Sequence, residues 1–291
     1  MAVSKSLVLL AMFRSILGQD PTESCTLSFD GRIPSNAEPA LFVSNASPFN
    51  PKFDIGQNLT WDQIIEFPNV PPSRFDNNGT KPIGLSLSDK SIFASSSEGQ
   101  EVALRRAELL VNGKNETVSG HKTWHISLRT DPTRPLNYTH EYVLVFHEAQ
   151  DFQADFWSVK TGSHLEGNPP TSQKMLRVEG YKFDVPVKTF FETPLTDDVW
   201  HNFGINLDFP NNMISVYYST DNDPLKLVVP PRSTISQALP RPPLEKPTLV
   251  CRNVPLVQTY RTSCLMVHSR PVLTRQCSLV GSSRTTLALD V

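Results

Sequence analysis

Apolar residues stand at every second position in many short runs between about residues 25 and 220. In the run 122–129, Trp124, Ile126 and Leu128 share one face, and the residues between them are polar or charged. A period of two predicts strands with one buried face. Turn-forming Pro, Asn, Asp and Gly separate further runs of this kind at 83–87, 103–111, 140–148, 156–161, 185–191, 203–209 and 214–219. Many short strands joined by turns predict an all-β protein, either a two-sheet sandwich, a jelly roll or a barrel.

Helical periodicity is scarce along the chain. The best candidate is the short segment Trp61–Glu66, which follows Thr60, a residue type that commonly caps the N-terminus of a helix. We therefore expect a sandwich that carries only a few short helices.

The composition changes abruptly near Val229. Residues 230–291 contain no Phe or Trp and a single glycine, but much Pro, Ser, Thr and Arg. A segment so poor in aromatic residues buries too little apolar surface to offset its ordering entropy. We therefore expect a β-sheet domain at residues 19–229 and a largely irregular, poorly ordered tail at residues 230–291, with weak strand-like pieces such as Thr248–Cys251. A solvated tail is the favoured interpretation, and a tail that binds an acidic partner is the alternative.

The N-terminus and the sequons predict a secreted glycoprotein. Residues 1–18 begin with Lys5 and a short apolar run and end near a small residue, as a secretory signal peptide does. The pattern Asn-x-Ser/Thr, which is the acceptor for N-glycosylation, occurs at Asn45, Asn58, Asn78, Asn115 and Asn137. An oxidising compartment permits disulfides, but four cysteines allow three pairings and the sequence does not choose among them.

Charge narrows the range of partners. The formal net charge is −2, yet residues 1–229 carry −8 and residues 230–291 carry +6. An acidic body argues against nucleic acid as the ligand, because phosphate binding needs clustered Lys and Arg. The N-terminal apolar run is far shorter than the ~20 residues that span a bilayer, so we expect no membrane partner either.

Common cofactor and metal motifs are missing from the sequence. It contains no Gly-rich nucleotide-binding fingerprint, no G-x-S-x-G and no C-x-x-C or close Cys/His cluster. We therefore expect neither a cofactor nor a metal site.

Carboxylates on polar strand faces are the remaining candidates for chemistry. Arg106 and Glu108 alternate with apolar residues. Glu141 lies opposite the apolar face that Tyr142, Leu144 and Phe146 form in its own run, whereas Glu148 has the parity of that apolar face. Two carboxyl groups across a sheet could act as acid and base in glycoside hydrolysis. A neighbouring cation such as Arg106 would favour the ionised form of one of them. A structural ion pair is the plainer interpretation of Glu108 beside arginine.

Another polar strand face could contribute to such a site. His125 shares its face with Ser127 and Arg129, and all three could line a cleft. A solvated strand face is an equally good interpretation of these residues.

Several ordered segments resemble glycoside hydrolase family 131. They cover about residues 28–220 and include Ser47-Pro-Phe-Asn-Pro51, Gly56-Gln-Asn-Leu-Thr-Trp61, Glu66-Phe-Pro-Asn-Val-Pro-Pro72, Arg105-Arg-Ala-Glu-Leu-Leu110, Arg134-Pro-Leu-Asn-Tyr-Thr-His-Glu-Tyr142, Lys160-Thr-Gly162 and Thr196-Asp-Asp-Val-Trp-His-Asn202. The resemblance implies a secreted fungal β-glucanase with a β-jelly-roll fold and an open cleft, acting on β-1,3-, β-1,6- and β-1,4-linked glucans.

The resemblance also implies a catalytic carboxylate pair, which falls on Glu108 and Glu141. We expect Arg106, His125 and Lys160 to bind substrate, a β-glucan polysaccharide or oligosaccharide, and we expect the protein to be a monomer. Retention or inversion of the anomeric centre depends on the carboxyl separation, which the sequence does not give.

The resemblance stops after Thr220. The segment that follows is similar to a chain translated from a shifted frame or a misjudged splice site, a hypothesis that transcript sequencing across codons 220–235 tests. If the closing strands of the jelly roll are missing, a sheet edge is left unpaired and part of the core is lost.

Two other functional classes stay open. A jelly-roll polysaccharide lyase could use Tyr142, His125 and Arg106, although a uronate substrate favours a basic cleft and this body is acidic. A non-catalytic glucan-binding protein would need exposed aromatic platforms, for which the candidates are Trp61, Trp124, Trp157 and Trp200.

Overall fold

The computed structural model describes residues 26–51, 59–95, 99–112, 115–148, 155–164, 172–184, 186–234, 248–254, 262–270 and 273–274. The predicted signal peptide at residues 1–18 and the sequon at Asn58 lie outside these residues.

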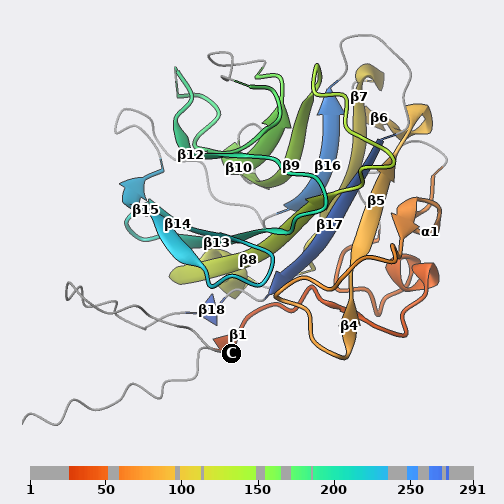
Figure 1. The fold of residues 1–291 in the computed structure, drawn as a ribbon, viewed down its shortest axis with the longest axis horizontal. Coiled ribbons are helices and arrows are strands. Elements are labelled where there is room, and N and C mark those ends of the chain that lie inside the picture. Colours follow the sequence, from red (N-terminus) through yellow and green to blue (C-terminus); the bar gives the residue numbers. More distant parts are fainter. Residues whose placement is uncertain are drawn as a thin grey trace, which may run out of the picture.

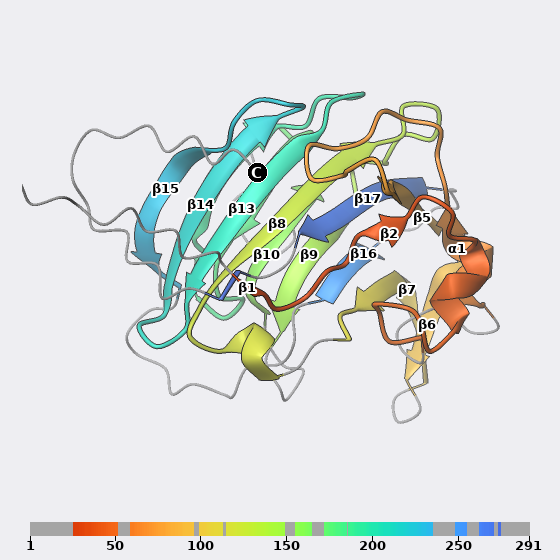
Figure 2. The ribbon, with the colours of Figure 1, turned by 90° about the horizontal axis from the view of Figure 1, so that it is seen from below.

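Two seven-stranded antiparallel sheets form a sandwich, which confirms the predicted all-β, two-sheet class (Figure 1). The first sheet runs, in spatial order, through β12 (Thr189–Pro194), β11 (Met175–Glu179), β10 (Asp155–Gly162), β9 (Glu141–Glu148), β16 (Thr248–Val254), β7 (Gly99–Leu110) and β6 (Ile92–Ser95). The second sheet runs through β15 (Lys226–Ser233), β14 (Met213–Thr220), β13 (His201–Asp208), β8 (His121–Thr130), β17 (Thr262–Arg270), β5 (Ile83–Leu87) and β3 (Ile65–Glu66). Figure 2 shows the second sheet in front and strands of the first sheet behind it.

Short elements complete the described fold. The helix α1 (Trp61–Ile64) starts where the sequence predicts one, and the backbone N–H of Thr60 donates to the Gln63 side chain at 3.1 Å. The remaining short elements are the 3-10 helices η1 (Pro39–Val43), η2 (Asp89–Ser91) and η3 (Asn115–Val118) and the strand pairs β1 (Thr26–Leu27) with β18 (Leu273–Thr274) and β2 (Ile33–Pro34) with β4 (Thr80–Lys81). A bilayer-spanning helix, which needs length and sustained apolarity, is not found among the residues described.

The core lies between the sheets and follows the period-two pattern. Trp124, Ile126 and Leu128 of β8 belong to one buried cluster with Ala107 and Leu109 of β7 in the opposite sheet. The polar residues that alternate with them therefore point away from the core, one set on the outer face of each sheet. These outer faces are where the ionisable side chains of each sheet must be sought.

A β-bulge interrupts the simple alternation in β9. The pairing with β10 shifts by one residue between Val143 and Val145, so an extra residue is accommodated on the β9 side. Tyr142, Leu144 and Val145 consequently belong to the main core, whereas Val143 and Phe146 form a separate buried pair. The predicted common face of Tyr142, Leu144 and Phe146 is wrong at Phe146, because a bulge reverses the parity of every residue beyond it.

The expectation of an irregular tail after residue 229 is wrong at residues 230–233, 248–254 and 262–270, which are in strands. The predicted boundary falls inside β15, and β16 and β17 are strands of seven and nine residues. β16 pairs with both β7 and β9, and β17 pairs with both β8 and β5 (Figure 1). Strands from this segment thus lie inside both sheets rather than at their edges. Backbone pairing between two neighbours stabilises a strand even where the composition is poor in aromatic residues. The shifted-frame hypothesis stays a prediction.

Candidate active site

Glu108 lies on β7 and points away from the core. Its neighbours Ala107 and Leu109 face the core, so the alternation of the strand places Glu108 and Arg106 together on the outer face. The Arg106 guanidinium donates to both carboxylate oxygens: Nη2 is 2.7 Å from Oε2, and Nε donates to Oε1. The Glu108 side chain is only 1% exposed. A bidentate fork of this kind fixes the plane of the carboxylate as well as its position.

A second group of charges occupies the same sheet face on β9, β10 and β11. Lys160 Nζ lies 3.7 Å from Glu141 Oε1 and 3.3 Å from Glu179 Oε2. All three side chains are less than a tenth exposed. One ammonium group therefore contacts two buried carboxylates. The distance between Glu141 Oε1 and Glu179 Oε2 is at most the sum of their two distances from Lys160 Nζ.

Glu179 has cationic partners beyond Lys160. Arg177 Nε donates to Glu179 Oε1 at 2.9 Å, and His164 Nε2 lies 3.3 Å from the same oxygen. Arg177 Nη1 also donates to the Gly162 carbonyl at 2.9 Å, which ties β11 to β10.

These contacts perturb the titration of the group. Burial alone would raise the pKa of Glu179, but Lys160, Arg177 and His164 outweigh it and the pKa is lowered. Burial likewise opposes charge on Lys160, yet Glu141, Glu179 and Asp155 raise its pKa. The set is therefore a charged network held together by mutual neutralisation.

The backbone register relates the two predicted catalytic residues. β16 lies between β7 and β9, with Glu108 opposite Val250 and Glu141 opposite Val254. The two glutamates are thus two strands apart and offset by four residues along the strand direction. On a flat sheet this places their Cα atoms about 16 Å apart. Glu108, Arg106, Glu141 and Lys160 therefore share one sheet face, but the two carboxylates are not directly opposite each other.

His125 lies elsewhere. It belongs to β8 of the second sheet, alternates with core residues, and stacks on Phe75 with ring centroids 5.2 Å apart. The whole core separates it from the face that carries Glu108 and Glu141. The structure therefore does not bring His125 together with the other predicted site residues, since β8 is in the opposite sheet.

The groups needed by the two alternative functions are not arranged for them. Tyr142 is fully buried in the core, where its hydroxyl accepts from the Asn137 backbone N–H at 3.0 Å, so a lyase site made of Tyr142, His125 and Arg106 is not formed. The proposed platforms of a binding protein are also wrong, because the large apolar rings fill the core instead: Trp61, Trp124, Trp157 and Trp200 are each at most 2% exposed.

Sequence reasoning missed β11 and with it Arg177 and Glu179. The signal was present, because Leu176 and Val178 alternate with these two charged residues over a five-residue run. The run is short and stands alone between loops. Its importance comes from pairing with β10, which brings Arg177 beside Lys160 in the register.

The sequons differ in accessibility. Asn45 and Asn78 are exposed, and Asn115 begins η3. Asn78 lies in a turn where Gly79 N donates to the Asn77 side chain at 2.8 Å and the Thr80 hydroxyl donates to Asp76 at 2.9 Å.

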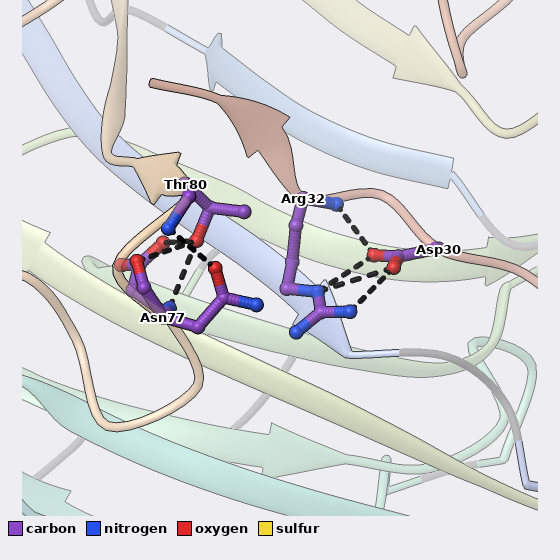
Figure 3. A network of polar contacts seen from close by, with 6 residues as sticks. Asp30, Arg32, Asn77 and Thr80 are labelled. Atoms are coloured by element: carbon purple, nitrogen blue, oxygen red, sulfur yellow. Dashed lines mark hydrogen bonds and ion pairs between the residues drawn. The ribbon is translucent and has the colours of Figure 1, made fainter.

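The turn that contains Asn78 lies beside a short strand pair near the N-terminus. It precedes β4, whose partner β2 follows the Asp30–Arg32 ion pair (Figure 3). Asn137 is half-buried, and its side-chain oxygen accepts from the backbone and hydroxyl of Thr139.

Among the described residues, no group of three or more His, Cys, Asp or Glu is placed to hold a metal ion.

Comparison with known proteins gives one family. A family model described as the glycoside hydrolase 131 catalytic N-terminal domain matches residues 27–238. The catalytic domain of the glycoside hydrolase family 131 protein from Coprinopsis cinerea is similar in structure, with a TM-score of 0.61 and 15% identity over 84% of this chain and 93% of that one. A GH131 beta-glucanase catalytic domain from Podospora anserina gives 0.64 and 18% identity over 85% and 95%. Identities this low show a common fold. The search of curated proteins found no match.

Proposed function

Because this chain belongs to glycoside hydrolase family 131, we propose that it is a secreted β-glucanase that hydrolyses β-1,3/1,6- and β-1,4-glucosidic bonds of cell-wall glucans. Glu108 and Glu141 are the catalytic pair in this proposal. The observation that carries it is that both carboxylates lie on the outer face of one sheet, shielded from water and each beside a cation. The β-glucanase activity of the Podospora anserina protein supports the choice of substrate.

The contacts suggest different roles for the two glutamates. Glu108 accepts both hydrogen bonds of the Arg106 fork, which fixes the orientation of the carboxylate and suits the role of the base that activates water. Lys160 Nζ contacts both Glu141 and Glu179 and lies closer to Glu179, so its electrostatic attraction to Glu141 is the weaker of the two. We assign Glu141 as the general acid that protonates the leaving glycosidic oxygen.

The register favours inversion of the anomeric centre. Glutamate side chains extend about 4–5 Å from Cα, so even two that lean fully toward each other across about 16 Å keep their carboxyl groups at least roughly 6–8 Å apart. Inverting enzymes use about 6.5–9.5 Å and retaining enzymes about 5–5.5 Å. NMR of the first-formed anomer tests this assignment, and initial formation of the β-anomer from a β-glucan would contradict it.

The central experiment measures reducing-sugar release from a β-1,3/1,6-glucan and from a β-1,4-glucan. We expect Glu108→Gln, which is nearly isosteric, to lower kcat by about 10²–10⁴-fold because it removes the base. Glu148→Gln is the matched control, since Glu148 is at the other end of the strand that carries Glu141. Equal release by wild type and Glu108→Gln would remove Glu108 from the chemistry.

A second substrate separates the roles. Glu141→Gln should lose most activity on glucan but retain much more on an aryl β-glucoside whose leaving group needs no protonation. Glu108→Gln should lose activity on both substrates. Reversal of this pattern would exchange the two assignments.

Secretion and glycosylation are parts of the same proposal. Exposure of Asn45 and Asn78 supports glycans at these positions. Expression in a glycosylating host should give a protein whose mass falls on enzymatic deglycosylation, and Asn78→Gln should remove one increment of that mass. An unmodified protein retained inside the cell would contradict the proposal.

A further inference from the structure

Polar and aromatic side chains gather in the loops at one end of the first sheet, where Glu141 begins β9. β10 ends at Gly162, opposite Glu141, and at the same end β11 begins and β12 finishes, with Met175 paired to Pro194. The loops at these strand ends carry four residues that we call the rim: Tyr138, Gln173, Lys174 and Asp197. The rim stands beside a proposed catalytic residue, yet the catalytic assignment uses none of its members.

Hydrogen bonds hold the loops of the rim in a fixed relation to one another. The Ser163 hydroxyl donates to the Thr139 carbonyl at 2.9 Å, and the Gln173 side-chain amide donates to the Ser163 hydroxyl at 3.1 Å. The Gly162 N–H donates to the Gln173 carbonyl at 3.0 Å. The loop before β9 is thus joined to the loop between β10 and β11, and a site built on joined loops loses less entropy when it binds a ligand.

Lys174 and Asp197 extend the rim toward β12. Lys174 Nζ lies 2.6 Å from Asp197 Oδ2 and 5.7 Å from the centroid of the Tyr138 ring. The two charged side chains are 40% and 44% exposed. An ammonium group has three donors and Asp197 accepts one of them, so the others are available to a ligand. An exposed ion pair adds little to stability, so stability alone does not account for this arrangement.

These groups match the chemistry of a sugar ring. A glucosyl unit presents hydroxyl groups at its edge, which amide and ammonium groups can hydrogen-bond, and C–H groups on its faces, which pack on an aromatic ring. Burial raises the pKa of Tyr138 to about 12, so its hydroxyl keeps its proton and can also donate.

The order of the strands places the rim in line with the two proposed catalytic residues. Glu108 is on β7 and Glu141 is on β9, and the rim continues past β9 at the ends of β10, β11 and β12. Neighbouring strands are about 5 Å apart. A glucan chain that crosses the strands past Glu108 and Glu141 therefore meets the rim next.

We propose that the rim is a binding subsite for a glucosyl unit of the substrate chain, on the side of Glu141 away from Glu108. The proposal rests on the proposed function, because it takes a β-glucan as the ligand. Gln173 and Lys174 donate to hydroxyl groups of this unit, and the Tyr138 ring packs against its face. The subsite adds affinity for a chain long enough to reach it and takes no part in proton transfer.

The test is the affinity for linear hexasaccharides with β-1,3 and with β-1,4 linkages, measured by titration calorimetry. Glu108→Gln serves as the background, because it should bind these chains without cleaving them. We expect Lys174→Gln or Gln173→Ala to raise the Kd about tenfold, as loss of a hydrogen bond from a charged or polar donor should. Titrations use deglycosylated protein, so that a glycan on Asn137 cannot cover the rim. An unchanged Kd for both linkages would overturn the proposal.

Lys188→Gln is the matched control. Lys188 is 43% exposed and pairs with Asp184 at 3.6 Å, but it lies in the turn between β11 and β12 at the opposite end of the sheet. Its removal should change the Kd by less than about twofold. Equal weakening in Lys188→Gln and Lys174→Gln would reduce the effect to a loss of charge and overturn the subsite. Tyr138→Leu tests the ring, and if it does not fold, the two exposed positions decide.

NMR distinguishes direct contact from a structural role. The nitrogen-15 signal of the Gln173 side-chain amide, identified by its loss in Gln173→Ala, should shift when a hexasaccharide is added. A signal that stays in place while the hexasaccharide binds would overturn the proposal.

The same experiments separate this subsite from the proposed function. Binding that depends on the rim, without any release of reducing sugar, would reject the glucanase and keep the subsite. Release of reducing sugar with an unchanged Kd in the rim variants would reject the subsite alone. A protein that neither binds nor cleaves the chains would reject both.

Discussion

The imidazole of His201 illustrates how a buried side chain couples the protonation state of one residue to the stability of the fold. Its Nε2 lies 3.1 Å from the Thr196 N–H, and its Nδ1 lies 2.7 Å from the Tyr218 hydroxyl oxygen. The neutral ring accepts the Thr196 N–H at Nε2 and donates from Nδ1 to Tyr218, whereas the protonated ring would donate from Nε2 to the Thr196 carbonyl oxygen, which lies 3.3 Å from it. Burial lowers the pKa of His201, against weaker opposing effects of Thr196 and Asp221.

The stability of the protein should therefore fall as the solution is acidified from pH 7 to pH 5. The unfolded chain takes up a proton near pH 6.5 and the folded chain takes it up at lower pH, so the stabilisation is complete above that value and is lost below it. The slope from one such histidine is at most about 1.4 kcal/mol per pH unit. Urea denaturation at several pH values measures it.

Two variants make this test specific. His201→Asn cannot titrate and should flatten the dependence between pH 7 and pH 5. His121→Gln removes an exposed histidine, with a side chain 45% exposed, and should leave the dependence unchanged. An unchanged slope in His201→Asn would show that another group is responsible. The loss of stability that follows protonation of Glu179 occurs at lower pH, because the pKa of Glu179 is lowered from that of an ordinary carboxyl group.

The sequence predicts single site residues only as far as parity and local neighbours reach. Arg106 beside Glu108 could be predicted, because residues two apart on a strand share a face. The joining of Lys160 to Glu179 could not, since it depends on which strands become neighbours and in which register. His125 has the correct parity on its own strand, and its separation from the site follows entirely from the assignment of β8 to the second sheet.

At the scale of elements, central and edge strands differ in what they tolerate. Leu249 on β16 pairs with Leu109 of β7 on one side and Val145 of β9 on the other. Val228 on β15 lies at a sheet edge, inside a register shift, and the same strand already contains Pro230 and Pro231. Proline is compatible with an edge strand and incompatible with a central one, because it lacks the N–H that the ladder needs.

Leu249→Pro should therefore cost about 3 kcal/mol or more of unfolding free energy, whereas Val228→Pro should cost far less. Thermal and denaturant unfolding monitored by circular dichroism measure both. Similar losses in the two variants would mean that β16 does not hold a central position in the ladder.

The elements themselves were predicted unevenly. Strands with regularly alternating apolar residues were found at nearly their observed bounds, as for β5 and β8. The bulge in β9 was not found, because it is a property of the pair that β9 forms with β10 rather than of β9 alone. For a similar reason the sequence indicated β16 only as a weak strand-like piece at Thr248–Cys251 and did not indicate β17, since the stabilisation of both strands comes from neighbours on both sides and not from their own composition.

At the scale of the whole molecule, both sheets depend on the same late segment of the chain. Removal of residues 248–291 would take β16 from the middle of the first sheet and β17 from the middle of the second. Each sheet would then divide into two separate parts with four newly exposed edges in total, and the core would lose its continuity.

A chain ending at residue 247 should consequently show no cooperative unfolding transition and should bind a hydrophobic dye strongly. A chain ending at residue 274 keeps every described strand and should unfold at nearly the temperature of the full chain. Calorimetry compares the unfolding transitions of the full chain and of the two shortened chains. A cooperative transition in the shorter chain would show that the two sheets close without β16 and β17.

The position of β16 and β17 also has a consequence for synthesis. A ribosome makes β5, β7, β8 and β9 long before the two strands that fit between them. Until residue 270 has been made, those four strands each present an unpaired backbone edge, the feature through which nascent β-proteins associate with one another. Pairing partners far apart in sequence also slow folding. The nascent chain therefore has an extended period in which it can aggregate with other copies of itself, and chaperone supply will govern its yield.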